Sequence, residues 1–380
     1  MLIMTDSTQS RSSAAGWHLP FRARLPVLAD YVYLNTGTAG PIPQVAADAM
    51  AAEAHRELVE GRGNFATWDR FFARLMHCRQ LASDAMGCYV DEIALTHHTS
   101  EGINIVLWGI DWSAGDVVIS TSLEHDAIAV PMGILRERRG VELRFAEIGL
   151  GERERCLVGI EAALDEAGGR CKLLMLSHVA YNSGALLPLK EITALAHARG
   201  IPVLVDGAQT CGVMPLDVKE PGADFYTLSG QKWMLGPEGT GALYVDKERL
   251  ESLTPTFASY FTAKRHDFRG NLELQPTAQR FETGMVHRPS WAAFEASATW
   301  LLEEAGLERV WQRSLELTRA ARQRLEQIDG LEVITPAPQE TPLLSFDLPA
   351  FTPQQLFALC MDVAERERLI IRSTPHAPFC

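Results

Sequence analysis

The chain has 380 residues, which exceeds one ordinary core and favours a large domain combined with a smaller one. Its formal net charge of -13 argues against a nucleic-acid surface and against contact with an anionic membrane. No apolar run approaches the roughly 18 residues that a membrane-spanning helix needs.

The N-terminal segment and the cysteines bear on where the protein works. Residues 1–20 lack the charged start and the apolar block of a signal peptide, so we expect a disordered polar tail. The seven cysteines are scattered singly, without a CxxC pair. This usage suggests reduced thiols in a cytoplasmic protein.

Short apolar runs alternate with helical segments through the middle of the chain. A strand at 31–34 precedes helices at 44–60 and 68–86, which flank a segment expected to be mobile. From there to residue 245 the alternation predicts a mostly parallel sheet with right-handed crossovers. The strands expected in this sheet cover residues 92–96, 116–120, 141–148, 172–177, 201–205, 224–228 and 241–245, and helices include 159–166 and 188–199.

The last third of the chain has a different character. Residues 246–253 should form a short helix, and 257–274 are polar and aromatic, as an irregular loop over a pocket would be. The remainder predicts two long helices followed by a small α+β unit. The expected helices cover 289–306, 307–328 and 352–365, and the expected strands cover 331–335, 343–347 and 369–371.

Asp206 and Lys232 carry the strongest functional signal. Each follows an apolar run, and in an open α/β sheet the ligand crevice lies beyond the carboxyl ends of the strands. A desolvated lysine amine condenses with an aldehyde, and a carboxylate keeps a pyridine nitrogen protonated so that the ring accepts electrons. The pair therefore predicts a pyridoxal 5'-phosphate (PLP) enzyme with Lys232 as catalytic amine. The alternative is a helix-capping aspartate and an unrelated surface lysine.

The motifs around these two residues resemble one enzyme family. They are Asp206-Gly-Ala-Gln209, Ser229-Gly-Gln-Lys232-Trp233 and Gly236-Pro237. They are similar to motifs of the class V aminotransferase family of fold-type I PLP enzymes, which includes cysteine desulfurases, cystine C-S lyases and isopenicillin N epimerase-like proteins. The resemblance runs from about Tyr33 to the end of the chain.

The resemblance also implies an architecture. We expect an α/β fold in which residues 31–275 form a large PLP-binding domain, with a mostly parallel seven-stranded sheet flanked by helices. A tail at 1–30 precedes it and a smaller α+β domain at 276–380 follows. Members of the family pair as homodimers with active sites at the interface, and their substrates are amino acids.

Several residues are candidates for binding the cofactor. Gln209 can donate to the ring phenolate oxygen, and the Ser229 hydroxyl suits the phosphate. Most of the family has histidine at the position of Gln231. A glutamine can still donate a hydrogen bond to the phosphate, but it cannot carry charge. Thr99 and Ser100 begin a helix whose free N–H groups attract an anion, so we expect them at the phosphate, with plain helix capping as the alternative.

Other candidates follow from the resemblance. The family stacks a histidine on the cofactor ring, a role that implies proton handling for His125, unless it only caps a helix. A family asparagine contacts the ring oxygen or the substrate, which implies that role for Asn182, with a left-handed turn as alternative. Asn35 and Thr36 border the expected substrate pocket, unless Asn35 merely closes a turn.

Two features concern the phosphate and metals. Thr283 belongs to a motif that in the family crosses the dimer interface to the neighbour's phosphate. The threonine expected two residues later is Met285 here, so either Thr283 substitutes for it or the contact is lost. The adjacent His97 and His98 have no further ligands at a supporting spacing, so we expect no metal.

The chain ends eight residues after Arg372. In the resembled enzymes a further strand follows, and an arginine at its start forks onto the substrate carboxylate. Either the sequence is truncated, or Arg372 and other groups anchor the substrate.

The reaction type depends on a cysteine nucleophile. Desulfurases of the family place one a few residues after the arginine that corresponds to Arg372, where this chain has Pro375, His376 and Ala377. Cys380 is poorly spaced for that role. We therefore expect a C-S lyase that eliminates from cysteine, cystine or a thioether. Desulfuration, epimerisation, transamination and an inactive PLP-fold protein are the alternatives.

Overall fold

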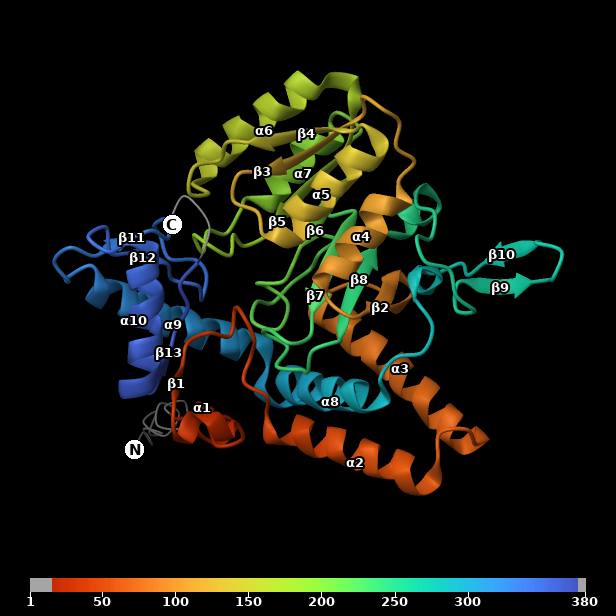
Figure 1. The fold of residues 1–380 in the computed structure, drawn as a ribbon, viewed down its shortest axis with the longest axis horizontal. Helices are drawn as coiled ribbons and strands as arrows, with labels where there is room; N and C mark the ends of the chain where they lie inside the picture. The colour runs from red at the N-terminus through yellow and green to blue at the C-terminus, as the bar shows by residue number, and fades with distance from the viewer. Residues whose placement is uncertain (1–15, 375–380) are drawn as a thin grey trace, which may run out of the picture.

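The computed structural model describes residues 16–374, and its centre is a seven-stranded sheet (Figure 1). The strand order is β2-β8-β7-β6-β5-β3-β4, and every strand is parallel to the others except β8. This confirms the predicted mostly parallel sheet. The strands are β2 (Ile93–Thr96), β3 (Val117–Thr121), β4 (Glu142–Ala146), β5 (Cys171–Ser177), β6 (Val203–Asp206), β7 (Phe225–Ser229) and β8 (Gly241–Val245).

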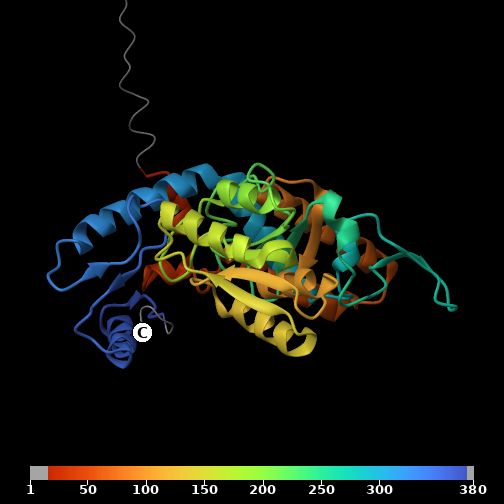
Figure 2. The same cartoon turned by 90° about the horizontal axis from the view of Figure 1, so that it is seen from above.

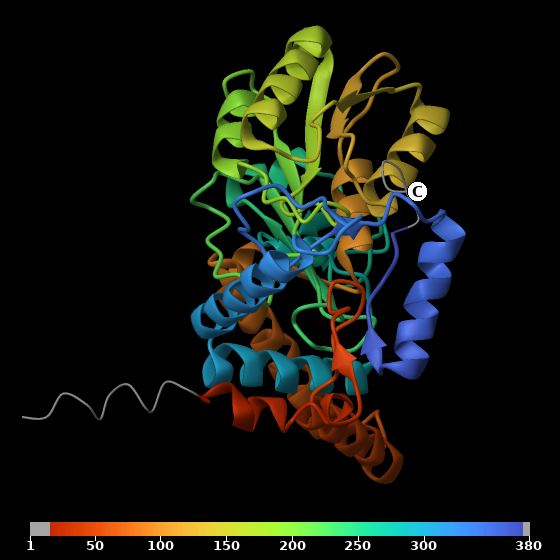
Figure 3. The same ribbon diagram turned by 90° about the vertical axis from the view of Figure 1, so that its left-hand side faces the viewer.

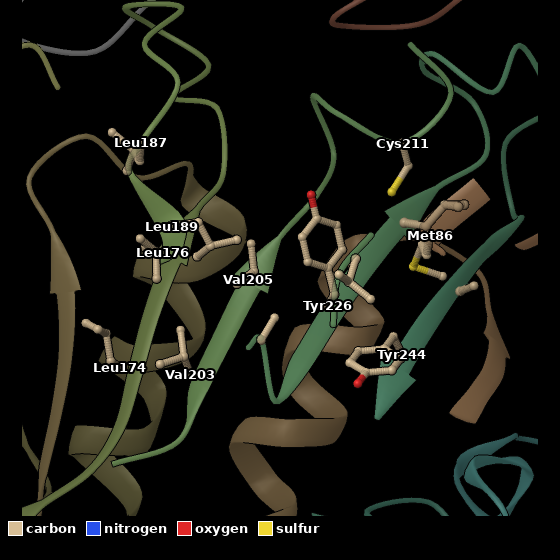
Figure 4. Close-up of a cluster of buried hydrophobic side chains, with 14 of the residues drawn as sticks. Met86, Leu174, Leu176, Leu187, Leu189, Val203, Val205, Cys211, Tyr226 and Tyr244 are labelled. Atoms are coloured by element: carbon tan, nitrogen blue, oxygen red, sulfur yellow. The ribbon is translucent and has the colours of Figure 1, made fainter. Parts of the chain in front are cut away.

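Both faces of the sheet are covered by helices, as its apolar strands require. Alternate residues of each strand enter two separate hydrophobic clusters, one under α3, α6, α7 and α8 and the other under α4 and α5. Figure 4 shows the first cluster, where Val203 and Val205 point to the same side as Tyr226 and Tyr244. The helices are α2 (Gln44–Glu60), α3 (Phe65–Met86), α4 (Thr99–Gly109), α5 (Asp126–Arg139), α6 (Arg153–Ala167), α7 (Leu189–His197) and α8 (Arg288–Thr299).

Two helices begin earlier than predicted. The side chain of Asn64 accepts a hydrogen bond from the backbone N–H of Thr67, so α3 begins at Phe65 within the segment expected to be mobile. Helix α6 begins at Arg153, six residues before the predicted start. The first turn of α6 is polar, and α3 begins directly after a polar cap, so apolar periodicity alone does not mark either start.

The C-terminal part lies at one end of the central sheet (Figure 2). Strand β1 pairs in parallel with β13, so the chain near residue 32 joins this part and not the main sheet. Helix α8 packs on α2 and α3, and Trp291 and Phe294 enter the main core. The domain limits at 30 and 275 stay predictions. The elements of the C-terminal part are β1 (Val32–Tyr33), α9 (Leu307–Leu325), β11 (Glu332–Val333), β12 (Phe346–Asp347), α10 (Pro353–Arg366) and β13 (Leu369–Ile370).

The expectation of an irregular loop over a pocket at 257–274 is wrong. Strands β9 (Ala263–His266) and β10 (Leu272–Leu274) form an antiparallel hairpin that projects from the body, away from the C-terminal part (Figure 1). The Asp267 carboxylate accepts from the backbone N–H groups of Arg269 and Asn271, and Gly270 has a φ of 88°. This turn chemistry closes the hairpin.

None of the helices between residues 16 and 374 is long and apolar enough to span a bilayer.

Candidate active site

Polar residues gather at the carboxyl edge of the parallel strands. Asp206 ends β6, Ser229 ends β7, and His125 precedes α5 just beyond β3. Figure 3, seen from the side of the C-terminal part, shows that part in front of the sheet. A hydrogen bond from the Thr341 hydroxyl to the carbonyl of Gly184 joins the two. The C-terminal part therefore lies over the edge of the sheet at which a ligand crevice is expected.

Lys232 lies in the turn that follows β7. Burial lowers the pKa of its amine, the charge of Asp206 raises it, and the charge of Arg372 lowers it again. Leu235, three residues on, holds a left-handed φ of 57°, which a residue other than glycine adopts at a cost in strain. Lys232 is therefore held in a strained turn where its neutral, nucleophilic form is favoured.

Asp206 and His125 lie close enough to Lys232 for their charges to interact. Burial lowers the pKa of His125, the charge of Lys232 lowers it further, and the charge of Asp206 raises it. The backbone N–H of Ala127 donates to His125 Nδ1 over 3.0 Å, so the neutral ring carries its proton on Nε2. Asp206 is 5% exposed and accepts from the N–H of Ala208. The three groups converge, although 26 positions separate Asp206 from Lys232 along the chain.

The start of α4 offers hydrogen-bond donors to an anion. The N-cap is His98, whose Nδ1 accepts from the backbone N–H of Glu101 over 3.1 Å. Thr99 and Ser100 are the first two helical residues, so neither is the cap that was the alternative for them. Their hydroxyls and N–H groups are suited to a phosphate. Between residues 16 and 374, no group of three His, Cys, Asp or Glu side chains is arranged to hold a metal.

Gln231 is oriented by its neighbour. The Ser229 hydroxyl donates to Gln231 Oε1 over 2.7 Å, which fixes the amide and leaves its NH₂ group as the donating end. Where the family's histidine could be charged, this chain presents a neutral donor. Ser229 is 2% exposed, and its single hydroxyl proton is donated to Gln231.

Gln209 and Asn182 are both engaged by the protein. Gln209 Nε2 donates to the carbonyl of Gly37 over 2.9 Å, and its Oε1 accepts from Trp233 Nε1 over 2.8 Å. One amide proton of Gln209 therefore remains for a ligand. Asn182, 3% exposed, accepts at Oδ1 from the N–H of Ser183.

The loop at residues 35–40 packs directly on the lysine turn. Gly40 N–H donates to the carbonyl of Gln231, and a Cβ on Gly40 would lie 2.1 Å from the carbonyl oxygen of Lys232, so only glycine fits. Thr36 lies in this loop, and the Asn35 side chain accepts from the Thr38 hydroxyl over 2.7 Å. That bond is the loop-closing contact raised as the alternative for Asn35.

Thr38 also accepts a hydrogen bond from Arg372 Nη1 over 3.0 Å. Sequence reasoning missed Thr38, since 334 positions separate the two residues. It also gave no role to Trp233, which orients Gln209. The place of Trp233, directly after the lysine, was the available signal.

Thr283 contacts α4 of its own chain. Its hydroxyl lies 3.4 Å from Glu101 Oε1, and Glu101 Oε2 accepts from the backbone N–H of His97 over 2.6 Å. Met285 is 45% exposed. Whether Thr283 also reaches the phosphate of a second copy stays a prediction.

The donor set fits PLP. The site combines an amine whose pKa is lowered by burial, a buried carboxylate and an imidazole. Hydrogen-bond donors from a hydroxyl, an amide and a helix N-terminus lie at the ends of neighbouring strands. These are the groups that an aldehyde, a pyridine nitrogen, an aromatic ring and a phosphate require.

Known proteins share this sequence and this fold. A family model described as aminotransferase class-V matches residues 32–373. A probable cysteine desulfurase of Methanothermobacter thermautotrophicus is 30% identical over 93% of this chain and 86% of its own length. One from Pyrococcus abyssi is 26% identical over 93% and 87%.

Solved structures agree. A mutant of C-DES with glycine covalently linked to its PLP cofactor has a TM-score of 0.85 and 26% identity, covering 93% of this chain and 91% of C-DES. A complex of the cystine C-S lyase C-DES with its product cysteine persulfide gives 0.84 and 26%, covering 92% of each. The fold is thus that of the fold-type I PLP enzymes, and the chain belongs to the class V aminotransferase family.

Proposed function

We propose that this protein is a PLP-dependent lyase that cleaves the C–S bond of cysteine, cystine or a thioether amino acid. The observation that carries the proposal is the shared environment of Lys232, Asp206 and His125, in which each group's charge acts on another. The family membership and the lyase and desulfurase relatives support it.

Bound PLP would supply an electron sink for the bonding pair of the substrate's alpha C–H bond. Asp206 would face the pyridine nitrogen, and His125 would lie against the ring, with its Nε2 proton directed into the pocket. Gln209 would give its remaining amide proton to the ring oxygen, with Asn182 beside it. The phosphate would be held by Thr99, Ser100, Gln231 and, as a weaker assignment, Thr283. Ser229, which the sequence also suggested for the phosphate, would act through Gln231, because its hydroxyl proton is donated to that amide.

Lys232 would move the alpha proton. A base for this step needs a proton affinity near the working pH, and burial brings the pKa of Lys232 down towards that range. Arg372 would pair with the substrate carboxylate, while Asn35 and Thr36 line the same side. The Thr38 hydroxyl would fix the direction of the Arg372 guanidinium.

Two reactions fit the relatives: elimination by a lyase and sulfur transfer by a cysteine desulfurase. Desulfuration needs a thiolate that attacks the substrate sulfur. Burial raises the pKa of each cysteine within residues 16–374, which disfavours the thiolate. The residues at the position of the desulfurase cysteine, and the last residue of the sequence, lie outside the described part of the chain; they are Pro375, His376, Ala377 and Cys380. The lyase is the reaction that we favour.

The test is a product assay on protein reconstituted with PLP. Cystine, cysteine and a cysteine thioether are supplied separately, and pyruvate, alanine and sulfide are measured. A C-S lyase forms pyruvate and a desulfurase forms alanine, so alanine without pyruvate from every substrate would overturn the lyase assignment. A protein that acquires no visible absorbance band with PLP would instead be an inactive member of the fold.

A second copy of this chain is the partner that we propose. Helix α3 exposes an apolar stripe of Phe65, Phe72 and Met76, whose fractional exposures are 90%, 41% and 52%. Positions spaced by seven and four residues share one helix face, and such a stripe on a surface helix marks an interaction site. We also expect a cytoplasmic location, where free thiols stay reduced.

A further inference from the structure

The carboxyl group of Glu124 links the turn that carries His125 to the end of β5, the strand that lies next to Asp206. Glu124 Oε1 accepts from the Thr121 hydroxyl over 2.6 Å, and Oε2 accepts from the Ser177 hydroxyl over 2.7 Å. The Ser177 backbone N–H lies within 3.1 Å of both oxygens. Ser177 is the register partner of Asp206 in the β5–β6 pair. One side chain therefore ties the ends of β3 and β5 together, and β5 is paired with the strand that carries Asp206.

Glu124 has no cationic partner in the described part of the chain. No Lys, Arg or His between residues 16 and 374 makes an ion pair with it. The titratable groups that face it are the Asp206 carboxylate on β6 and the Cys156 thiol on α6, and neither supplies positive charge at neutral pH. Two carboxyl groups thus share one corner of the crevice, and a cation placed there would be attracted by both.

The hydrogen bonds of Glu124 suit two charge states. Hydroxyl groups both donate and accept, so Thr121 and Ser177 can donate to an ionised carboxylate or accept from a protonated one. Only the Ser177 backbone N–H is a fixed donor. Burial raises the pKa of Glu124 to about 7, and the charge of Asp206 contributes to the rise. With this pKa the carboxyl group is partly protonated at neutral pH, and a positive charge nearby would lower the pKa.

We propose that Glu124 is a positioning residue of the cofactor site, which fixes the His125 turn to the end of β5 beside Asp206 and gives up its proton to solvent when a protonated pyridine ring binds beside Asp206. This inference rests on the proposed function, since it assigns the corner at Asp206 to a pyridine nitrogen. No bond other than that to the proton changes. The negative charge that the carboxylate gains balances the positive charge of the bound ring.

The apo-protein gives the first readout. Because the pKa of Glu124 is higher in the folded protein than in the unfolded chain, the folded state binds the extra proton between pH 4.5 and 7. The stability that Glu124 contributes is thus present at low pH and is lost as the pH rises through 7. We expect the unfolding equilibrium of the wild type, relative to Glu124→Gln, to shift by on the order of 10²-fold across this window.

The cofactor gives the second readout. With saturating PLP, the bound cation lowers the pKa of Glu124, so the difference in melting temperature between the two proteins should depend less strongly on pH than it does without PLP. Affinity for PLP should be roughly tenfold weaker in Glu124→Gln than in the wild type at pH 8, and equal at pH 5.5. A purely structural role predicts a constant loss of stability at every pH, with or without PLP.

Thr121→Val is the companion variant, in case Glu124→Gln does not fold. It removes one donor to the ionised carboxylate and keeps the charge, so the midpoint of the stability profile should move to higher pH. Parallel pH profiles of the wild-type and Glu124→Gln apo-proteins, or a profile that PLP leaves unchanged, would overturn the proposal. A wild-type protein that binds no PLP would instead overturn the proposed function, and the apo-protein profile still separates the two failures.

Discussion

At the scale of single residues, the activity that we propose would depend on the amine of Lys232, whose pKa is lowered by burial. Replacing Lys232 by alanine removes the only amine that we assign to the chemistry, so turnover should fall by at least ~10²-fold. Sodium borohydride should no longer link PLP covalently to the protein. Lys247→Ala, an exposed lysine near the end of β8, is the matched control and should behave as the wild type. Retained turnover in Lys232→Ala would exclude the assigned role.

The residues that we assign to the reaction could be proposed from the sequence because their chemistry is visible there, whereas their supporting residues could not. A polar residue at the end of a buried strand, such as Asp206, stands out from its apolar neighbours. Thr38 and Trp233 act on Arg372 and Gln209 through the fold, over separations of 334 and 24 positions. No local pattern encodes such partners, and Glu124 was passed over beside the more obvious His125.

At the scale of elements, a buried ion pair joins α3, β2 and the segment before α8. Glu282 Oε1 accepts from Arg79 Nη2 over 2.6 Å and from the N–H of Leu95 over 2.9 Å. Both side chains are only 6% exposed. Burial raises the pKa of Glu282 even though Arg79 opposes the rise. Glu282 can therefore bind a proton if it loses its partner, while an arginine cannot give one up.

This asymmetry gives a prediction. Glu282→Gln leaves the Arg79 charge buried without compensation and should lower the free energy of unfolding by about 3–5 kcal/mol. Arg79→Met should cost less, because Glu282 can become neutral and keep its bond to Leu95. Urea denaturation midpoints of the two variants measure the difference. Equal losses, or a larger loss in Arg79→Met, would contradict this explanation of the pair.

The alternation of apolar runs was sufficient to predict the central sheet, because strands that are buried on both faces are mostly apolar. The prediction failed where polar chemistry sets the structure. Asp267 closes the β9–β10 turn with its own side chain, and Asn64 caps α3, so neither boundary appears in the hydrophobic pattern. Hydrophobic periodicity describes what is buried, and these elements are fixed at their exposed ends.

At the scale of the whole molecule, the stripe of Phe65, Phe72 and Met76 on α3 lies far from the C-terminal part (Figure 1). If a second copy covers it, a charge placed there would be buried in the pair and left exposed in the single chain. Phe65→Glu combined with Met76→Glu should therefore convert a dimer into monomers while leaving the fold intact. Sedimentation velocity gives the mass, and circular dichroism checks the fold.

Phe357→Glu is the control for this prediction, because Phe357 is 62% exposed on α10, on the opposite side of the molecule. It should leave the mass of the assembly unchanged. Burial of apolar surface stabilises an assembly, so two glutamates at the two ends of the stripe should weaken the pair far more than one glutamate outside it. An assembly that survives the α3 variant and dissociates in the α10 variant would place the interface on the C-terminal part instead.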